Sequence, residues 1–376
     1  MDVLLNEFQQ NLQSVIREFC LKELAPLADN IEKSGVVPPE IIRRMSELGI
    51  FGMPFDESYG GQGKGYLATT LVLEELARVS GGVAMVAGIN YLTGVPISLY
   101  GTEEQKINFL TPLCQGKAIG SFAFTEAATG SDPKAITTEA SLDGNEYVIN
   151  GQKRFVTAAD LDGIIVLSAF DGSGISAFIA EKNRKGYQVT YNWEKLGMHG
   201  ISLVDIKLED YRIPSGNLLG QKGNGYALLL DTIAIGKLNT CGIILGCAQS
   251  ALDEAIKYAR ERKVRGRPIA ENQMIQSLLA DVCVKVSAAR WMTYRLAALA
   301  DSGQDIRVES ALTKIFVTEA ATEAVHKAFR IHGAYAYVTD YRIERVLRDV
   351  YLGEIVEGSN EIQRTIVATS MLREAG

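Results

Sequence analysis

The periodicity of hydrophobic residues changes twice along this chain. From the start to about residue 116, apolar residues recur every three or four positions, as in Phe8, Leu12, Ile16 and Phe19. That spacing puts them on one face of an α-helix. It predicts an N-terminal helical domain over residues 1–118.

Between residues 119 and 225 the pattern becomes typical of β-strands. Apolar residues between positions 203 and 208 alternate with Asp205 and Lys207, so one face of the sheet is expected to meet water. Asn150-Gly151 lies between two strand-like runs, and this dipeptide favours a two-residue hairpin turn. The region predicts a small antiparallel β-domain over residues 119–225, with an exit linker at its end.

Helical periodicity returns at about residue 226 and continues to the C-terminus. Ile275 and Val282 belong to one apolar stripe, and Val308 and Leu312 belong to another. Gly266-Arg267-Pro268 is typical of the end of a helix. These patterns predict a C-terminal helical domain over residues 226–376.

Composition narrows the class of protein. The chain has 376 residues, a hydrophobic content of 47% and a net charge of −7, without a dense basic run, which argues against nucleic acid as a partner. It has 5 cysteines and 3 histidines, without metal-ligand spacing, so no metal site is expected. Neither a secretory signal nor a long uninterrupted apolar run is visible, so we expect a cytoplasmic protein that does not bind membranes.

A short stretch near the C-terminus carries the candidate chemistry. Glu357 follows the apolar Val356, so its carboxylate is expected in dry surroundings that raise its pKa. Gly358 permits a tight turn or the close approach of a flat ligand, and Ser359 can cap the helix that follows. A base beside a helix N-terminus suits proton abstraction next to a carbonyl. On this stretch alone, an ordinary acidic first turn of a helix remains the alternative.

The same stretch resembles a known family. Glu-Gly-Ser-Asn-Glu-Ile-Gln-Arg at residues 357–364, with Ile-Glu-Arg-Val-Leu-Arg-Asp at residues 343–349, resembles the C-terminal motif of the acyl-CoA dehydrogenase family. The resemblance covers essentially the whole chain and implies an α+β fold whose middle domain is an antiparallel β-domain and whose last domain is a four-helix bundle. It also implies that Glu357 is the base that removes the proton α to a thioester carbonyl.

Two further segments resemble the family's flavin motifs. Residues 124–132 resemble the motif that wraps the flavin ring of FAD, and residues 155 and 157 stand where relatives usually have Trp and Thr. A Gly-Ser turn and a core phenylalanine are the structural alternatives for these segments. The resemblance implies that the following residues lie at the flavin: Phe122, Phe124, Thr125, Gly130, Ser131, Phe155, Thr157 and Ser359.

The other half of the FAD site is expected from a neighbouring subunit. In the family an arginine at the position of Arg262 reaches the FAD pyrophosphate of the neighbour, although a cationic helix C-terminus is the simpler interpretation. Arg330 and Ala334 replace a more usual Gln and Gly. The resemblance implies a homo-oligomer, with a tetramer expected, in which the neighbour's cofactor meets Arg262, Gln273, Arg330 and Ala334.

The substrate side departs from the family pattern. Where relatives commonly have Asp and Arg, this chain has Ala234 and Lys237, and Gly236 takes a place where some members carry the base. Gly236 cannot act as a base, which leaves Glu357. The substrate is expected to meet Ser131, Lys237 and Gly358. Loss of the Asp and Arg pair also fits members that act on carrier-protein thioesters in polyketide or nonribosomal peptide pathways, with the basic segment 263–267 as a candidate docking rim.

The hypothesis from the sequence is an FAD-dependent acyl-thioester dehydrogenase. Its substrate would be an acyl-CoA or an acyl-carrier-protein thioester, and its electron acceptor an electron-transferring flavoprotein or oxygen. A flavin monooxygenase on the same fold is one alternative, although it would not need Glu357. A non-catalytic member of the fold is the other.

Overall fold

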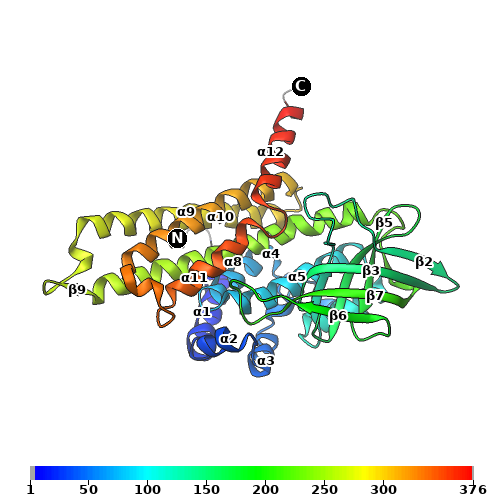
Figure 1. Ribbon diagram of the computed structural model, residues 1–376, viewed down its shortest axis with the longest axis horizontal. Coiled ribbons are helices and arrows are strands. Elements are labelled where there is room, and N and C mark those ends of the chain that lie inside the picture. The colour runs from blue at the N-terminus through cyan, green and yellow to red at the C-terminus, as the bar shows by residue number, and fades with distance from the viewer. Residues whose placement is uncertain (1–4, 375–376) are drawn as a thin grey trace.

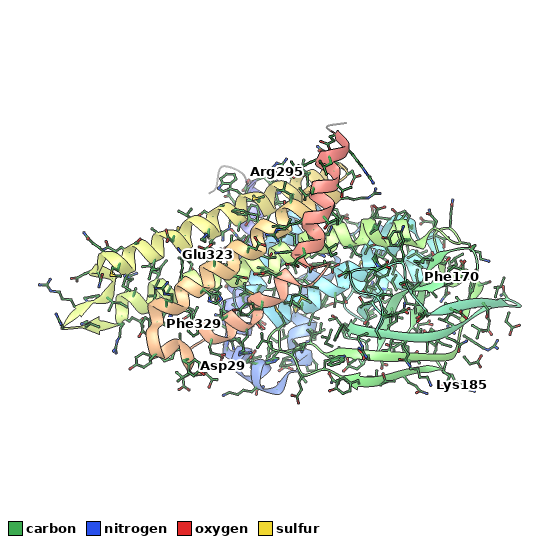
Figure 2. All side chains as sticks on the ribbon, turned by 45° about the horizontal axis from the view of Figure 1, so that its top comes forward. Asp29, Phe170, Lys185, Arg295, Glu323 and Phe329 are labelled. Atoms are coloured by element: carbon green, nitrogen blue, oxygen red, sulfur yellow. The ribbon has the colours of Figure 1, made fainter. Side chains whose placement is uncertain are left out.

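The computed structural model describes residues 5–374 and has three parts. Helices form the N-terminal part, a sheet lies at one end of the molecule, and long helices run to the other end (Figure 1). Figure 2 shows the same arrangement from another side, with Phe170 and Lys185 on the sheet end and Phe329 on the long helices. The N-terminal helices are α1 (Glu7–Phe19), α2 (Ala28–Ser34), α3 (Pro39–Glu47), α4 (Gly65–Ala77), α5 (Gly81–Tyr100), α6 (Glu103–Gln105) and α7 (Thr111–Cys114).

Two core helices connect the parts. Helix α5 packs against α4, against strand β1 (Ile119–Ala123) and against α8 (Gly225–Glu261). Among the described residues, α5 and α8 are long and apolar enough to cross a membrane by composition, yet 83% of each apolar window is buried inside the protein. Their apolarity follows from this burial, because a helix surrounded by other elements is hydrophobic on all sides.

The middle part is one sheet with strand order β6-β7-β3-β2-β4-β5-β8, and β1 pairs with β4. Most pairs are antiparallel, but β1 runs parallel to β4, and β2 also meets β4 in parallel. The sheet is therefore mixed, and the prediction of a purely antiparallel domain is corrected. The remaining strands are β2 (Glu139–Asp143), β3 (Glu146–Thr157), β4 (Gly163–Phe170), β5 (Ile175–Glu181), β6 (Tyr187–Asn192), β7 (Leu203–Pro214) and β8 (Leu218–Leu219).

Asn150-Gly151 does not form the predicted hairpin turn. Strand β3 continues through it, and its register against β7 shifts between Ile149 and Gly151, which marks a β-bulge. The Asn150 side chain accepts a hydrogen bond from the Asp210 N–H at 2.8 Å. A Cβ at Gly151 would lie 2.4 Å from the Thr138 hydroxyl oxygen, so close backbone approach explains the glycine.

The C-terminal part is a helical bundle. Helices α8, α9 (Gln273–Asp301) and α10 (Arg307–His332) pack along one another, and α11 (Ile343–Val350) packs on α8 and α10. Helix α12 (Asn360–Glu374) packs on α10 and then projects from the body (Figure 1). The bundle agrees with the predicted four-helix arrangement.

One local prediction in the bundle is wrong. Helix α8 ends at Glu261, and the Gly-Arg-Pro segment belongs to a small hairpin of β9 (Lys263–Val264) and β10 (Arg267–Pro268). Arg265 and Gly266 both have positive φ angles, as a two-residue hairpin turn requires. Val308 and Leu312 are exposed on α10, whose buried face carries small and polar side chains instead.

Candidate active site

Glu357 lies in a tight loop between η9 (Tyr351–Glu354) and helix α12. Its φ angle is 57°, in the left-handed region that non-glycine residues rarely adopt, and Gly358 follows with 83°. The Gln363 side chain donates hydrogen bonds to the carbonyl oxygens of Glu357 and Gly358 at 3.1 and 3.0 Å. Ser359 precedes α12, and its carbonyl accepts the Gln363 N–H. Helix α12 thus holds the loop in a strained shape, which is common at functional sites.

Gly236 on α8 provides the space for the Glu357 carboxyl group. A Cβ atom at Gly236 would lie 2.8 Å from the Glu357 Cδ and 2.9 Å from the Leu92 Cδ1 of α5. Any side chain at this position would displace the carboxyl group. The position that the sequence analysis excluded as an alternative base therefore directly faces the predicted base.

The Glu357 carboxylate is held without any direct partner. No residue of the described chain donates a hydrogen bond to it or forms an ion pair with it within 4.0 Å. Burial raises the pKa of Glu357 to about 7, while the charges of Lys237 and Lys314 act in the opposite direction. The direction is the one that the sequence predicts, and the value suits a general base at neutral pH.

The two lysines near Glu357 differ in their contacts. Lys237 is buried on α8, and no described group accepts a hydrogen bond from its ammonium. Lys314, on α10, is fully buried and donates to the Gly358 carbonyl at 2.8 Å and to the Asn360 side-chain oxygen at 3.1 Å. The sequence singled out Lys237 but missed Lys314, which sits within an otherwise ordinary helical pattern.

The predicted flavin residues come together where β1 and β3 end. The Arg154 N–H donates to the Thr125 carbonyl at 2.8 Å, and the Ser121 hydroxyl donates to the Thr157 carbonyl at the same distance. Phe122 and Phe124 lie beside each other, with ring centroids 6.4 Å apart. The sequence placed the motifs of residues 124–132 and 155–157 at one site, and these contacts join them.

This platform has the features that a flavin requires. Gly130 is exposed, and no atom lies within 4 Å of the place that a Cβ would take there, so a flat ring system can approach the backbone. Across the described chain, nothing pairs with the hydroxyls of Thr125, Ser131 and Thr157. Free hydroxyls can donate to or accept from the polar edge of the ring. The residues present therefore fit FAD.

Phe155 is oriented by residues that the sequence did not reveal. Its side chain is 50% exposed, its φ angle is 56°, and its ring lies 5.1 Å from that of Trp193. Asp205 fixes this arrangement, because its carboxylate accepts from the Phe155 N–H, from the Trp193 indole and from the Arg154 guanidinium. An exposed aromatic ring held in a left-handed conformation is not a core residue, which favours the flavin interpretation.

The residues predicted to bind a neighbour's cofactor lie together at the end of the bundle away from the sheet. Arg262 lies over the Tyr335 ring at 5.2 Å, next to Ala334, while Gln273 begins α9 and Arg330 belongs to the last turn of α10. The nearby β9 hairpin marks one end of the molecule in Figure 1, and the sheet marks the other. Within one chain these residues do not meet the platform of Thr125 and Phe155.

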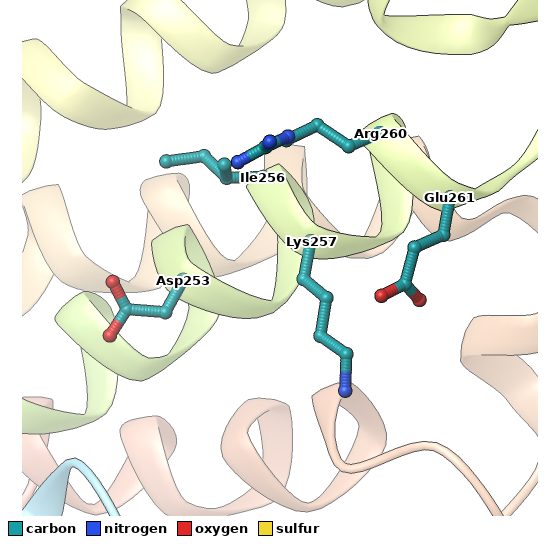
Figure 3. Close-up of a pocket in the computed structure, with 5 residues that line it drawn as sticks. All are labelled: Asp253, Ile256, Lys257, Arg260 and Glu261. Carbon is teal, nitrogen blue, oxygen red and sulfur yellow. The ribbon is translucent and has the colours of Figure 1, made fainter.

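A groove of about 460 Å³ accompanies this distant end of the bundle. Its lining residues all come from the last turns of α8, just before Arg262 (Figure 3). The groove is an open helix face, and it is separate from the Glu357 site. Its lining residues are Asp253, Ile256, Lys257, Arg260 and Glu261.

Comparison with known proteins agrees with this architecture along the whole chain. Family models for the N-terminal, middle and C-terminal domains of acyl-CoA dehydrogenases match residues 6–117, 121–211 and 223–372. A probable acyl-CoA dehydrogenase of Bacillus subtilis, YngJ, is 38% identical over 99% of this chain and 100% of its own length. CarC, a subunit of the caffeyl-CoA reductase-Etf complex of Acetobacterium woodii, is 36% identical over 98% of this chain and 99% of its own.

The solved structures give the same answer as the sequence matches. Butyryl-CoA dehydrogenase from Megasphaera elsdenii superimposes with a TM-score of 0.95 at 32% identity, covering 99% of this chain and 100% of that one. The match includes the helical parts and the mixed sheet, so the predicted fold and enzyme class are confirmed. The chain belongs to the acyl-CoA dehydrogenase family, whose members are FAD-dependent oxidoreductases.

Proposed function

We propose that this protein is an FAD-dependent dehydrogenase that removes hydrogen from the α and β carbons of an acyl-CoA thioester. The observation that carries the proposal is the Glu357 carboxylate, which faces Gly236 with a pKa raised to about 7 and without a hydrogen-bond donor in the described chain. A carboxylate that is desolvated but unpaired is poised to accept a proton.

The chain's own residues suit the two ends of this reaction. Glu357 would take the α proton, and no described group accepts the Glu357 backbone N–H, which leaves this donor free for the thioester oxygen. Leu92 and the helix α8 backbone at Gly236 exclude water from one side of the base. Bound FAD would supply the acceptor for the hydride that leaves the β carbon. Thr125, Ser131, Phe155 and Thr157 would hold its ring.

We further propose that the FAD site is completed by a second copy of the chain, in a homotetramer. Arg262 follows α8 directly and precedes β9, at the end of the molecule opposite the sheet, and it lies over Tyr335, the neighbour of Ala334, so these two residues do not serve the platform of their own chain. Exposed apolar side chains on α9, α10 and α12 supply a surface for assembly, since large exposed apolar patches mark interaction sites. They include Val284, Trp291, Leu312, Phe316, Met371 and Leu372.

The acyl carrier and the electron acceptor are proposed in the same way. CoA is the preferred carrier, because the basic hairpin suggested as a docking rim for a carrier protein lies with Arg262, away from Glu357. An electron-transferring flavoprotein is the preferred acceptor, in keeping with the Etf complex to which the similar CarC belongs. The expected cytoplasmic location remains a prediction.

The test is flavin reduction in the purified protein. The protein is expected to be yellow, with about one FAD per chain, and to lose its flavin absorbance when mixed anaerobically with an acyl-CoA from a panel of short, branched and aryl-substituted esters. The same acyl groups on a holo-carrier protein form the second arm. Colourless protein that cannot be reconstituted with FAD would contradict the proposal. Faster flavin reduction by the carrier-bound esters would show that the acyl carrier is a carrier protein and not CoA.

A further inference from the structure

Lys314 stands out among the buried charges because its ammonium connects α10 to both sides of the Glu357 loop. Its Nζ donates to the Glu354 carbonyl at 3.3 Å, before the base, and to the Gly358 carbonyl at 2.8 Å, after it. The third contact, at 3.1 Å, is to the Asn360 side-chain oxygen at the start of α12. An ammonium has three protons, so all of its donors are used.

The environment of Lys314 makes this contact set rigid. The side chain is fully buried. Asn360, its side-chain acceptor, is itself buried and donates to Thr318, one turn further along α10, at 3.0 Å. Glu354 is tied to α10 as well, because its carboxylate accepts from the Thr322 hydroxyl at 2.7 Å. The loop therefore has fixed points on both sides of Glu357, although the Glu357 carboxylate itself has none.

We propose that Lys314 is a positioning residue for proton abstraction. By holding the carbonyls of residues 354 and 358, it keeps Glu357 in its left-handed conformation, with the carboxyl group directed at Gly236. It does this without contacting the carboxylate, because a direct ion pair with the ammonium would lower the pKa of Glu357 and weaken it as a base. The inference rests on the proposed role of Glu357, but it concerns a residue that neither the motif nor the resemblance assigns.

Lys314 also contributes charge to the site, and this gives its role a second signature. The charged groups that act on Glu357 are Lys314 from α10 and Lys237 from α8, and the apolar Leu92 from α5 lies beside the same glycine as its carboxyl group. Lys314 in turn interacts with Cys241 and Lys237 of α8 and with Glu354 of η9. The positive charge of Lys314 opposes the rise in the pKa of Glu357 that burial causes. A neutral residue at position 314 should raise that pKa further, whereas loss of a purely structural contact would not.

The test compares Lys314→Met with Lys314→Gln in the FAD-loaded protein. Lys314→Met removes the charge and the hydrogen bonds, so the limiting rate of flavin reduction should fall about 100-fold, as misplacement of a reacting group by about 1 Å can cause. Lys314→Gln keeps an amide donor and should recover part of that rate. In both variants the acid limb of the pH–rate profile should move up by about one unit, because a nearby opposite charge is lost.

A matched control and a readout independent of turnover complete the design. Lys327→Met removes a lysine from the same helix, where it pairs with Asp281, and should leave rate and profile unchanged. The infrared band of the protonated Glu357 carboxyl, assigned by its loss in Glu357→Gln, should titrate at higher pH in Lys314→Gln without any substrate. Amide hydrogen exchange at residues 355–359 should accelerate in Lys314→Met.

Failure of this inference is distinguishable from failure of the proposed function. A wild-type protein whose flavin no thioester reduces would contradict the proposed function, while the infrared and exchange measurements would still test Lys314. The inference would be overturned if both variants showed the same infrared titration of Glu357 and the same amide exchange as the wild-type protein. If Lys314→Met does not fold, Lys314→Gln alone decides the matter through its titration.

Discussion

Two glutamates in this chain, the buried Glu126 and the half-buried Glu357, lie near lysines, and their surroundings have opposite effects on them. Glu126, in the sheet domain, accepts hydrogen bonds from the Lys153 ammonium at 2.7 Å, from the Thr137 N–H and hydroxyl, and from the Thr138 N–H. Glu357, in the bundle, has two lysines nearby and a hydrogen bond from neither. The difference lies in direct contact.

The pKa values follow from this difference. Burial raises the pKa of Glu126, but the charge and hydrogen bond of Lys153, with the threonine donors, outweigh it and bring the value to about 2. For Glu357 burial prevails over the more distant charges of Lys237 and Lys314, and the value rises to about 7. A fully bonded carboxylate is a stable part of a core, whereas an unbonded one costs stability and can react.

The largest effect is expected from Glu357→Gln, which keeps the shape of the side chain but removes its basicity. The rate of flavin reduction should fall by at least the roughly 10²–10⁴-fold that general-base catalysis contributes, because Glu357 supplies the carboxyl group that lies beside Gly236. Stopped-flow absorbance would measure it, with exposed Glu361→Gln on the following helix as the control. A rate within tenfold of the wild-type rate would show that another residue is the base.

At Glu126, the second glutamate of the comparison, we expect a variant to lower folding stability with little direct effect on flavin reduction. Lys153→Met leaves Glu126 as a buried charge without its partner, and breaking such a pair costs about 3–5 kcal/mol. Urea unfolding followed by the β-sheet signal would measure the change. Lys207→Met, which removes an exposed lysine paired with Glu209 on the same strand, should cost at most about 1 kcal/mol. Equal losses of unfolding free energy in the two variants would show that the buried Lys153–Glu126 pair stabilises the protein no more than the Lys207–Glu209 pair on the surface.

The sequence predicted the parts of the fold and site that depend on local pattern or on a motif. Period-3.6 and period-2 patterns located the helical and sheet regions, and the motif around Glu357 located the base. The bulge at Asn150-Gly151 could not be predicted, because the close approach of Thr138 is a tertiary contact. The apolar stripe of Val308 and Leu312 is exposed in one chain, because periodicity alone does not show whether such a face packs in the core or in an assembly.

The missed site residues share one physical reason. Lys314, Asp205 and Trp193 act through contacts with segments more than ten residues away, and nothing in their local sequence distinguishes them. Lysine is almost never fully buried unless its charge is paired or hydrogen-bonded, but the apolar stripe of α10 is its exposed face, so the local pattern does not reveal that Lys314 lies on the buried one.

A third prediction uses the opposite signs of the two pKa shifts. The folded state holds a proton on Glu357 up to about pH 7, against about 4.5 for an exposed glutamate, so its favourable contribution is lost as the pH rises through that range. Glu357→Gln should therefore stabilise the protein at pH 8 by about 1–3 kcal/mol and have no effect below pH 4.5. Glu126→Gln should destabilise it at pH 8, because the depressed pKa of Glu126 adds stability above pH 4.5. Thermal unfolding between pH 4.5 and 8 would measure both, and a destabilised Glu357→Gln at pH 8 would contradict the proposed desolvation.

The smallest expected effect comes from two glycine variants in α8, which distinguish the need for space beside Glu357 from the stability of that helix. Gly236 and Gly242 both lie inside α8, and replacing either with alanine should favour the helix by about 0.5–1 kcal/mol. At Gly242 the new Cβ would meet its nearest neighbour at 3.4 Å, an ordinary contact, whereas at Gly236 it would lie 2.8 Å from the Glu357 carboxyl carbon. Gly236→Ala should therefore slow flavin reduction about tenfold by displacing the base, while Gly242→Ala should keep the wild-type rate. Measured together by stopped flow and thermal unfolding, equal rates in the two variants would show that the Glu357 carboxyl group does not need the position beside Gly236 to react.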